Sequence, residues 1–377
     1  MTYPAAANPV RARDLGVPFD GTPGQHNAIT DVPGLEVGFV TLSHDEPVVA
    51  RTGVTAILPR GRDKAGLPCA AGVAVLNGNG ELTGRSWIEE SGQLQAPIAI
   101  TNSHAVGAVH RGVDQWMAEH HPTVAAAWML PVVGETWDGY LNSINADTVH
   151  PEHALAALDA ASTGPVAEGN VGGGTGMNCY GFKGGTGTAS RIVRTADRDY
   201  TVGVLLQANF GSRHELKVAG RPLGRESLAP NPMESSGWFA EEAGVGHAAV
   251  PGAGSVIVIV ATDVPLLPDQ CRALARRVPL GLARTGTTAS HFSGDIFLAF
   301  STANEGALAS RMGTATGATE QIETLAWGGI DPFYAATVEA VEEAVINALV
   351  AATDTVGRKG HASFALPHDE VRAAFGS

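Results

Sequence analysis

The chain has 377 residues, of which 44% are hydrophobic and 16% charged, a balance typical of a folded protein with a large core. Its net charge of −14 argues against binding to nucleic acid, because phosphate backbones are bound by clustered Lys and Arg. An acidic chain weakly favours cationic small molecules, although solubility is the simpler interpretation.

Short apolar or β-branched segments bounded by Gly, Pro or Asn predict strands along the chain. Several are apolar on both faces, which indicates central strands covered by helices. The predicted strands are Val54–Leu58, Ala70–Leu76, Ala96–Thr101, Val202–Ala208, Ser255–Ala261 and Asp295–Ser301.

Segments typical of helices alternate with these strands, and together they predict a layered α/β fold. We expect Ser103 and Asp331 as N-caps, with Pro332 at a first helical position. The last helix has an apolar stripe at helical spacing, formed by Phe333, Val338, Val341, Val345 and Leu349. The predicted helices are Ser103–His120, Pro151–Ala161, Pro268–Leu282 and Asp331–Ala352.

Two glycine-rich regions interrupt this pattern. Residues 211–254 are polar, rich in Gly and Pro and without clear periodicity, so we expect a long structureless loop, which is typical of a functional segment or a linker. The stretch Gly169–Gly187 has neither the GxxxxGK[ST] nor the GxGxxG spacing of a phosphate loop. It predicts tight turns and close backbone approach instead.

Several common sites are not indicated by the sequence. The cysteines Cys69, Cys179 and Cys271 lie far apart and predict neither a disulfide framework nor a zinc site. No HExxH or GxSxG motif occurs, so we expect no catalytic metal, no cofactor and no α/β-hydrolase triad. The N-terminal residues show no signal peptide and no apolar run is long enough to span a membrane, so we expect a cytoplasmic protein.

The junction between Gly254 and Ser255 places a hydroxyl residue at the start of a buried apolar strand. By itself this is the ordinary sequence of a strand that follows a glycine turn. The same junction suits self-cleavage, because glycine tolerates strained dihedrals and leaves its carbonyl open to attack by the Ser255 hydroxyl. Ser255 would then have a free α-amine, with an ordinary pKa of about 7.7–8.0, that can act as general base for its own hydroxyl.

A second pair of polar residues stands at the start of a later strand. Ser293 and Asp295 flank a glycine, and residues two apart in a strand face the same side, so the hydroxyl and the carboxylate can share one site. A turn with a capping Ser and Asp explains the same residues equally well.

These junctions occur together with further motifs, and the chain resembles the DmpA/BapA family of self-processing serine aminopeptidases over nearly its whole length. The matching segments, in chain order, are Ile29–Gly38, Arg51–Ile57, Gly134–Gly139, Gly169–Met177, Gln207–Gly211, Gly254–Ser255, Ser293–Asp295 and Leu366–Asp369.

The resemblance implies a four-layer αββα sandwich with two stacked sheets between helical layers. It implies a single catalytic domain, cut into an α-chain of residues 1–254 and a β-chain of residues 255–377. Members of this family release N-terminal residues from short peptides, amides or esters without a metal, and relatives form larger assemblies of αβ units. The preference among L-, D- and β-amino acids stays open.

The resemblance also implies roles for individual residues. Ser255 corresponds to the nucleophile, Ser293 to the serine that bonds the nucleophile and its amine, and Asp295 to an acid that is Glu in some members. Asn209 corresponds to the oxyanion-hole amide. Residues of the preceding loop complete the site: Glu135 corresponds to the acid that holds the substrate ammonium, and Trp137 to a Tyr or Trp at the oxyanion hole or pocket wall.

Two other interpretations remain open at this point. One is a self-processing acyltransferase or oligoamide hydrolase of the same fold, although those enzymes use Thr where this chain has Ser255. The other is an uncleaved, non-catalytic binding protein, against which the intact junction, Asn209, Ser293 and Asp295 argue.

Overall fold

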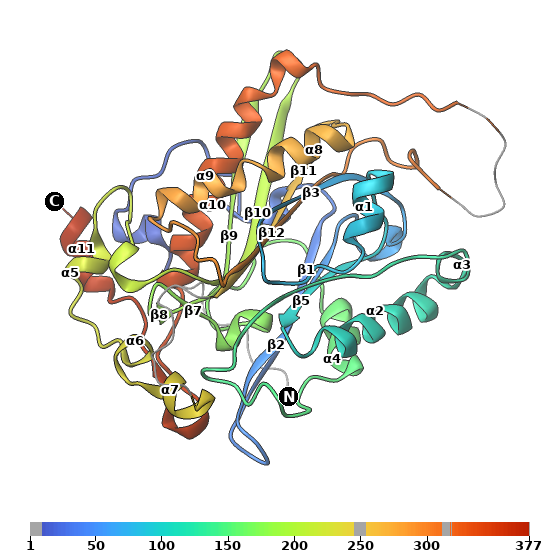
Figure 1. Cartoon of the computed structure of the whole chain (residues 1–377). Coiled ribbons are helices and arrows are strands. Elements are labelled where there is room, and N and C mark those ends of the chain that lie inside the picture. The colour runs from blue at the N-terminus through green and yellow to red at the C-terminus, as the bar shows by residue number, and fades with distance from the viewer. Residues whose placement is uncertain (1–9, 245–253, 311–316, 318, 377) are drawn as a thin grey trace.

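Two β-sheets lie at the centre of the computed structural model, which describes residues 10–244, 254–310, 317 and 319–376 (Figure 1). The smaller sheet consists, in order, of β1 (Glu36–His44), β2 (Ala50–Leu58), β5 (Ile98–Asn102) and β6 (Val132–Thr136). The larger sheet consists of β4 (Gln93–Leu94), β3 (Cys69–Gly78), β12 (Gly294–Ser301), β11 (Ser255–Thr262), β10 (Asp199–Asn209) and β9 (Gly185–Arg194).

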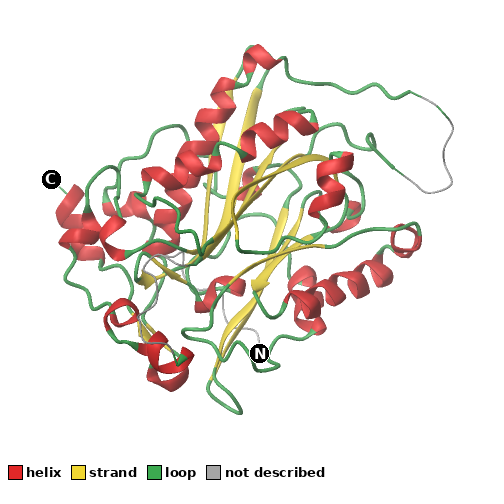
Figure 2. Cartoon of the chain, in the orientation of Figure 1, coloured by secondary structure: helices red, strands yellow, loops and turns green. Residues whose placement is uncertain are grey.

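Helices cover the outer face of each sheet, and the yellow strands of Figure 2 lie between the red helices. The smaller sheet packs against α2 (Val106–His120) and α4 (Pro151–Asp159), and the larger one against α8 (Pro268–Ala275), α9 (Val278–Arg284) and α10 (Asp331–Val350). Further elements are α1 (Arg85–Ser91), α3 (Pro122–Ala126), α11 (His368–Phe375) and the two-residue strand pairs β7 (Asn178–Cys179) with β8 (Phe182–Lys183) and β13 (Thr355–Val356) with β14 (Ala362–Ser363).

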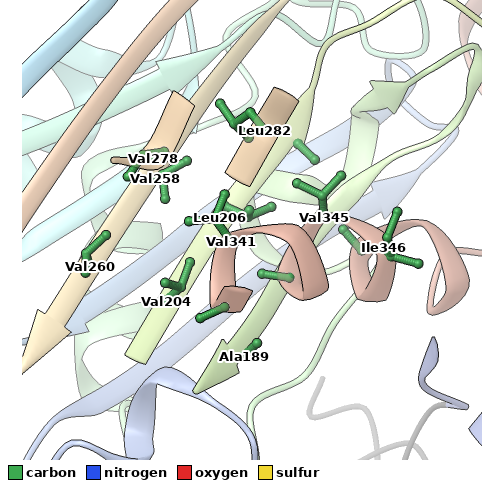
Figure 3. Close-up of a cluster of buried hydrophobic side chains, with 14 of the residues drawn as sticks. Ala189, Val204, Leu206, Val258, Val260, Val278, Leu282, Val341, Val345 and Ile346 are labelled. Atoms are coloured by element: carbon green, nitrogen blue, oxygen red, sulfur yellow. The ribbon is translucent and has the colours of Figure 1, made fainter. Parts of the chain in front are cut away.

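The alternation of side chains along the strands creates three apolar layers. In β11, Val258 and Val260 face α9 and α10, where they pack with Val278, Leu282 and Val341 (Figure 3). Ile257 and Ile259 face the other way and join the core between the two sheets. β11 is therefore apolar on both faces, as the sequence predicts for a central strand. The result confirms a four-layer αββα sandwich.

The predicted strands and the last helix are confirmed, with small shifts at their ends. The stripe of α10 is buried as expected. Two N-caps were assigned wrongly. α2 begins at Val106 rather than after Ser103, because the Ser103 hydroxyl bonds Glu135 instead of capping the helix. α10 begins at Asp331 itself, with Ile330 as its N-cap.

The predicted helix Pro268–Leu282 is wrong as a single helix. α8 ends after Ala275 and α9 begins at Val278, with Arg276 and Arg277 between them. Pro279, the second residue of α9, has no N–H to continue the hydrogen-bond ladder of α8, which explains the break.

The polar stretch that follows residue 211 is not structureless over its described part. It forms α5 (Leu223–Glu226), α6 (Pro232–Ser235) and α7 (Trp238–Ala243). These helices are too short to show a periodic apolar pattern, which is why the sequence did not reveal them. Residues 245–253, the rest of the predicted loop, lie outside the described residues.

The glycine-rich stretch 169–187 forms tight turns with close backbone approach, as predicted, and its last residues begin β9. A Cβ added to Gly173 would lie 2.2 Å from Gln207 Oε1, and one added to Gly174 would lie 2.4 Å from the Thr186 nitrogen. This packing brings β7 beside the end of β10, which ends in Asn209.

Candidate active site

Ser255 is the first residue of β11, in the middle of the larger sheet. It lies opposite Asn209 of the antiparallel strand β10 and opposite Gly294 of the parallel strand β12. Directly opposite residues of an antiparallel pair present their side chains on the same face. For Ser255 and Asn209 this is the face toward the smaller sheet, since Ile257, two residues along, packs between the sheets.

The peptide bond before Ser255 is already hydrogen-bonded to its neighbours. The Ser255 hydroxyl donates to the Gly254 carbonyl oxygen at 2.6 Å, and the Gly294 N–H lies 3.1 Å from that oxygen and 3.2 Å from Ser255 Oγ. A Cβ on Gly254 would lie only 2.0 Å from the Asn209 carbonyl oxygen. Lack of space therefore requires glycine at position 254.

Ser293 and Asp295 form the predicted pair beside this junction. Ser293 Oγ donates to Asp295 Oδ1 at 2.6 Å, and Asn77 Nδ2 of β3 donates to Asp295 Oδ2 at 2.8 Å. Burial raises the pKa of Asp295, while hydrogen bonds from Ser293, Asn77 and the Val256 backbone lower it. Among the described residues, no hydrogen bond joins Ser255 Oγ directly to this pair; the backbone of Gly294 and Val256 connects them.

Asn209 has a fixed amide orientation. Its Oδ1 accepts a hydrogen bond from the Asn178 N–H at 2.9 Å, and its Nδ2 donates to the Trp137 carbonyl at 2.9 Å. Because an amide nitrogen has two hydrogens, one donor of Asn209 remains for another acceptor.

Glu135 lies near the same junction, at the end of β6. Its Oε1 accepts from the Glu81 N–H at 2.9 Å, and Ser103 Oγ donates to its Oε2. Burial raises the pKa of Glu135, and the hydrogen bonds from Ser103 and Glu81 oppose that shift. A Cβ on Gly80 would lie 3.2 Å from Glu135 Oε1 and 3.0 Å from the Gly294 Cα, so a single glycine separates the carboxylate from the strand beside Ser255.

Trp137 is half-buried and stacks on Trp238 of α7, with ring centroids 6.1 Å apart. Trp238 also contacts Tyr140 and donates from its indole to the Met233 carbonyl. Within the described part of the chain, the Trp137 indole N–H makes no hydrogen bond, and only its backbone carbonyl contacts Asn209. The geometry favours an apolar wall at Trp137, supported by a segment that we expected to be structureless.

Sequence reasoning missed four contributors to this site. Asn77 directly follows the predicted strand Ala70–Leu76, Asn178 lies in a stretch predicted as turns, Gly294 lies between Ser293 and Asp295, and Ser103 was interpreted as a helix cap. All four act through the backbone or through a contact distant in sequence, for which the sequence offers no periodic signal. Only the position of Gly294 between Ser293 and Asp295 marked it.

The three cysteines are buried in the hydrophobic core. Burial raises the pKa of the Cys69 thiol to about 11, and Cys179 and Cys271 are also fully buried and shifted upward. In the described ranges, no three His, Cys, Asp or Glu side chains come together as a metal site. No described helix is both long and apolar enough to cross a membrane.

The fold and the serine at the start of its central strand define a hydrolase of the N-terminal-nucleophile type. Residues 27–363 match the model of Peptidase family S58. The chain is 48% identical over 375 residues to the β-peptidyl aminopeptidase BapA of Sphingosinicella microcystinivorans, covering 98% of this chain and 92% of the relative.

Two solved structures have the same fold. A β-aminopeptidase from Burkholderia sp. superposes with a TM-score of 0.87 and 45% identity, covering 98% of this chain and 99% of that one. The second is the L-aminopeptidase D-Ala-esterase/amidase of Ochrobactrum anthropi, described as a prototype of the serine aminopeptidases and a variant of the Ntn hydrolase fold. It superposes with a TM-score of 0.87 and 43% identity, covering 96% of this chain and 97% of that one. The chain belongs to Peptidase family S58 and is a serine aminopeptidase.

Proposed function

We propose that the chain cuts itself between Gly254 and Ser255 and then uses Ser255 to release the first residue of short peptides, amino-acid amides or esters. One observation carries the proposal: the Ser255 hydroxyl lies 2.6 Å from the Gly254 carbonyl oxygen, at the mouth of the central strand. The products are an α-chain of 254 residues and a β-chain of 123 residues.

Self-cleavage frees the α-amine of Ser255 next to its own hydroxyl. An α-amine has an ordinary pKa of about 7.7–8.0 and can therefore accept the hydroxyl proton near neutral pH. Ser293 and Asp295 support this role, because Asp295 bonds Ser293 and the backbone of Val256, the residue after Ser255, and a neighbouring carboxylate stabilises the ammonium form.

The substrate is held on the opposite side of Ser255. Glu135 pairs with the free ammonium, which explains the choice of an N-terminal residue over an internal bond. The second Nδ2 hydrogen of Asn209 is available to an oxyanion that forms beside Ser255. Trp137 forms the wall of the pocket for the first side chain.

Turnover is then acyl transfer to water. Ser255 Oγ attacks the carbonyl carbon after the first residue, and its proton passes through the α-amine to the leaving amine. The acyl–nitrogen bond breaks and leaves an ester on Ser255. A water molecule, with the same amine as base, hydrolyses this ester and restores the hydroxyl.

The substrate class follows from the relatives only in outline. The names of the BapA relatives and the Burkholderia enzyme specify β-peptidyl or β-aminopeptidase activity, whereas the Ochrobactrum enzyme is named for L-residues and D-alanine derivatives. We propose a free-amine substrate of one of these kinds. A panel of L-, D- and β-aminoacyl p-nitroanilides measures the preference.

A denaturing gel tests the self-cleavage. We expect two fragments for wild type and for Ser290→Ala, since the side chain of this neighbouring serine makes no hydrogen bond in the described structure. Ser255→Ala should give one full-length band and no hydrolysis. A single full-length wild-type band with no hydrolysis of aminoacyl amides would favour the non-catalytic binding protein, and acyl transfer to an amine acceptor without hydrolysis would favour the acyltransferase.

We further propose a cytoplasmic homo-oligomer of αβ units with no metal or other cofactor, bound to neither nucleic acid nor membrane. Light scattering of the purified protein measures its oligomeric state. Activity after dialysis against EDTA tests whether the enzyme requires a metal. A monomer, or a loss of activity that added metal restores, would contradict these two statements.

A further inference from the structure

The backbone N–H of Gly294 contacts both atoms that take part in the proposed self-cleavage. It lies 3.1 Å from the Gly254 carbonyl oxygen and 3.2 Å from Ser255 Oγ. The first atom becomes negatively charged when its carbonyl carbon is attacked, and the second is the attacking oxygen. A donor placed here before the reaction stabilises the developing charge without reorganisation.

The side chain of Asn209 does not occupy this position in the uncut chain. Its Nδ2 donates to the Trp137 carbonyl and its Oδ1 accepts from the Asn178 N–H. Among the described residues, only the Gly294 N–H and the Ser255 hydroxyl itself donate to the Gly254 carbonyl.

We propose that the two reactions of Ser255 use different oxyanion donors: the Gly294 N–H in self-cleavage, and the Asn209 side chain in turnover. This inference rests on the proposed self-cleavage. In self-cleavage, Ser255 Oγ forms a bond to the Gly254 carbonyl carbon. The hydroxyl proton moves to the Ser255 nitrogen as the peptide bond between Gly254 and Ser255 breaks. Water then hydrolyses the ester, which yields the Gly254 carboxylate and regenerates the Ser255 hydroxyl beside a free amine.

The surroundings of Gly294 hold its N–H in place. A Cβ on Gly294 would lie 2.3 Å from the Asn79 carbonyl oxygen and 2.6 Å from the Gly80 Cα, so only glycine fits between this turn and β11. Two asparagines at the end of β3 hold the loop that precedes Gly294. Asn77 Nδ2 donates to the Ser290 carbonyl at 3.1 Å, and Asn79 Nδ2 donates to the Phe292 carbonyl at 2.8 Å.

Asn209→Ala separates the two reactions. We expect it to be cut into two fragments at close to the wild-type rate, while kcat for aminoacyl amides falls by about 10²–10³-fold, the usual effect of removing one oxyanion donor. Asn209→Asp is a second variant, since it keeps the oxygen that accepts from Asn178 and loses both Nδ2 hydrogens. Thermal unfolding of each variant, compared with Ser255→Ala, shows that it is folded.

Gly294→Ala tests the backbone donor itself. The added Cβ displaces β12 from the junction, so we expect processing to slow by roughly tenfold or more. The matched control is Gly78→Ala: Gly78 lies opposite Gly294 in the sheet, yet its added Cβ meets no atom within 4 Å. This control should be processed like wild type.

Two results would overturn the inference. A folded Asn209 variant that stays full length would show that Asn209 serves both reactions, and a Gly294→Ala chain processed at the wild-type rate would show that its N–H is not needed. An uncut wild type is a different result, because it removes the proposed self-cleavage altogether.

Discussion

The larger sheet and the edge of the smaller sheet contribute to the site in different ways. On the larger sheet, the strand starts of β11 and β12 hold Ser255, Ser293 and Asp295 through short backbone-linked hydrogen bonds. On the smaller sheet, β6 and the helix α7 place Glu135 and the stacked pair Trp137–Trp238. In the proposed mechanism, the first group breaks the bond and the second selects the substrate. Variants of the first group should therefore lose both self-cleavage and turnover, and variants of the second group should lose turnover alone.

The largest effect is expected on the larger sheet, from Ser293→Ala. This change removes the hydroxyl that donates to Asp295 beside the junction, so both self-cleavage and turnover should fall by about 10²–10⁴-fold, the range for a general acid–base partner. Gel time courses and kcat measure the two reactions. Processing at the wild-type rate would remove Ser293 from the mechanism, and Ser290→Ala is the control that should change neither.

On the smaller sheet, Glu135→Gln should leave self-cleavage intact, because no free substrate ammonium takes part in that step. Turnover should weaken by about 2–5 kcal/mol in kcat/KM, since an ammonium loses its partner at a buried site. An N-acetylated substrate, which has no ammonium, should be equally poor with wild type and variant. Equal loss of processing and turnover would contradict the division between the two sides.

A pH profile distinguishes two neighbouring asparagines. The hydrogen bond from Asn77 stabilises the ionised form of Asp295 and opposes the rise in pKa that burial causes. Among the described residues, no charged side chain contributes to this pKa shift. The nearby titratable groups are His291, which is exposed, and Glu135, which lies on the other side of Gly80. Asn77→Leu should raise the pKa of Asp295 further. Because activity needs the ionised carboxylate, activity should be lost at a higher pH as the solution is acidified. The acid limb of the profile of kcat against pH should therefore move to higher pH.

Asn79→Leu is the control for that profile, since Asn79 bonds the same loop through Phe292 without touching the carboxylate. Its acid limb should stay in place. If both variants moved the limb equally, Asn77 would act through the loop alone.

The smallest effect is expected from Trp238→Ala. Loss of the stacking on Trp137 should cost about 0.5–1.5 kcal/mol, seen as a higher KM for substrates with a bulky first residue and little change in kcat. Leu228→Ala, on an exposed side chain of the same segment, should behave like wild type. A fall in kcat with unchanged KM would place Trp238 in the chemistry instead.

The sequence predicted the two sides unequally. Apolar and β-branched runs, which are local signals, located β3, β10, β11 and β12 of the larger sheet but not β4 or β9. The Gly254–Ser255 junction marked Ser255 as a candidate nucleophile, and the family resemblance supported that interpretation. β6 was missed as a strand, so Glu135 and Trp137 came only from the family resemblance. Trp238 and Asn77 could not be predicted, since they reach the site from segments that have no periodic pattern or are distant along the chain.

N-terminal sequencing of the smaller fragment of purified wild-type protein tests the central claim most directly. The account predicts a fragment of 123 residues that begins Ser255-Val256-Ile257 and is absent from Ser255→Ala. A fragment that begins at another residue, or a wild-type chain that hydrolyses aminoacyl amides while uncut, would contradict it.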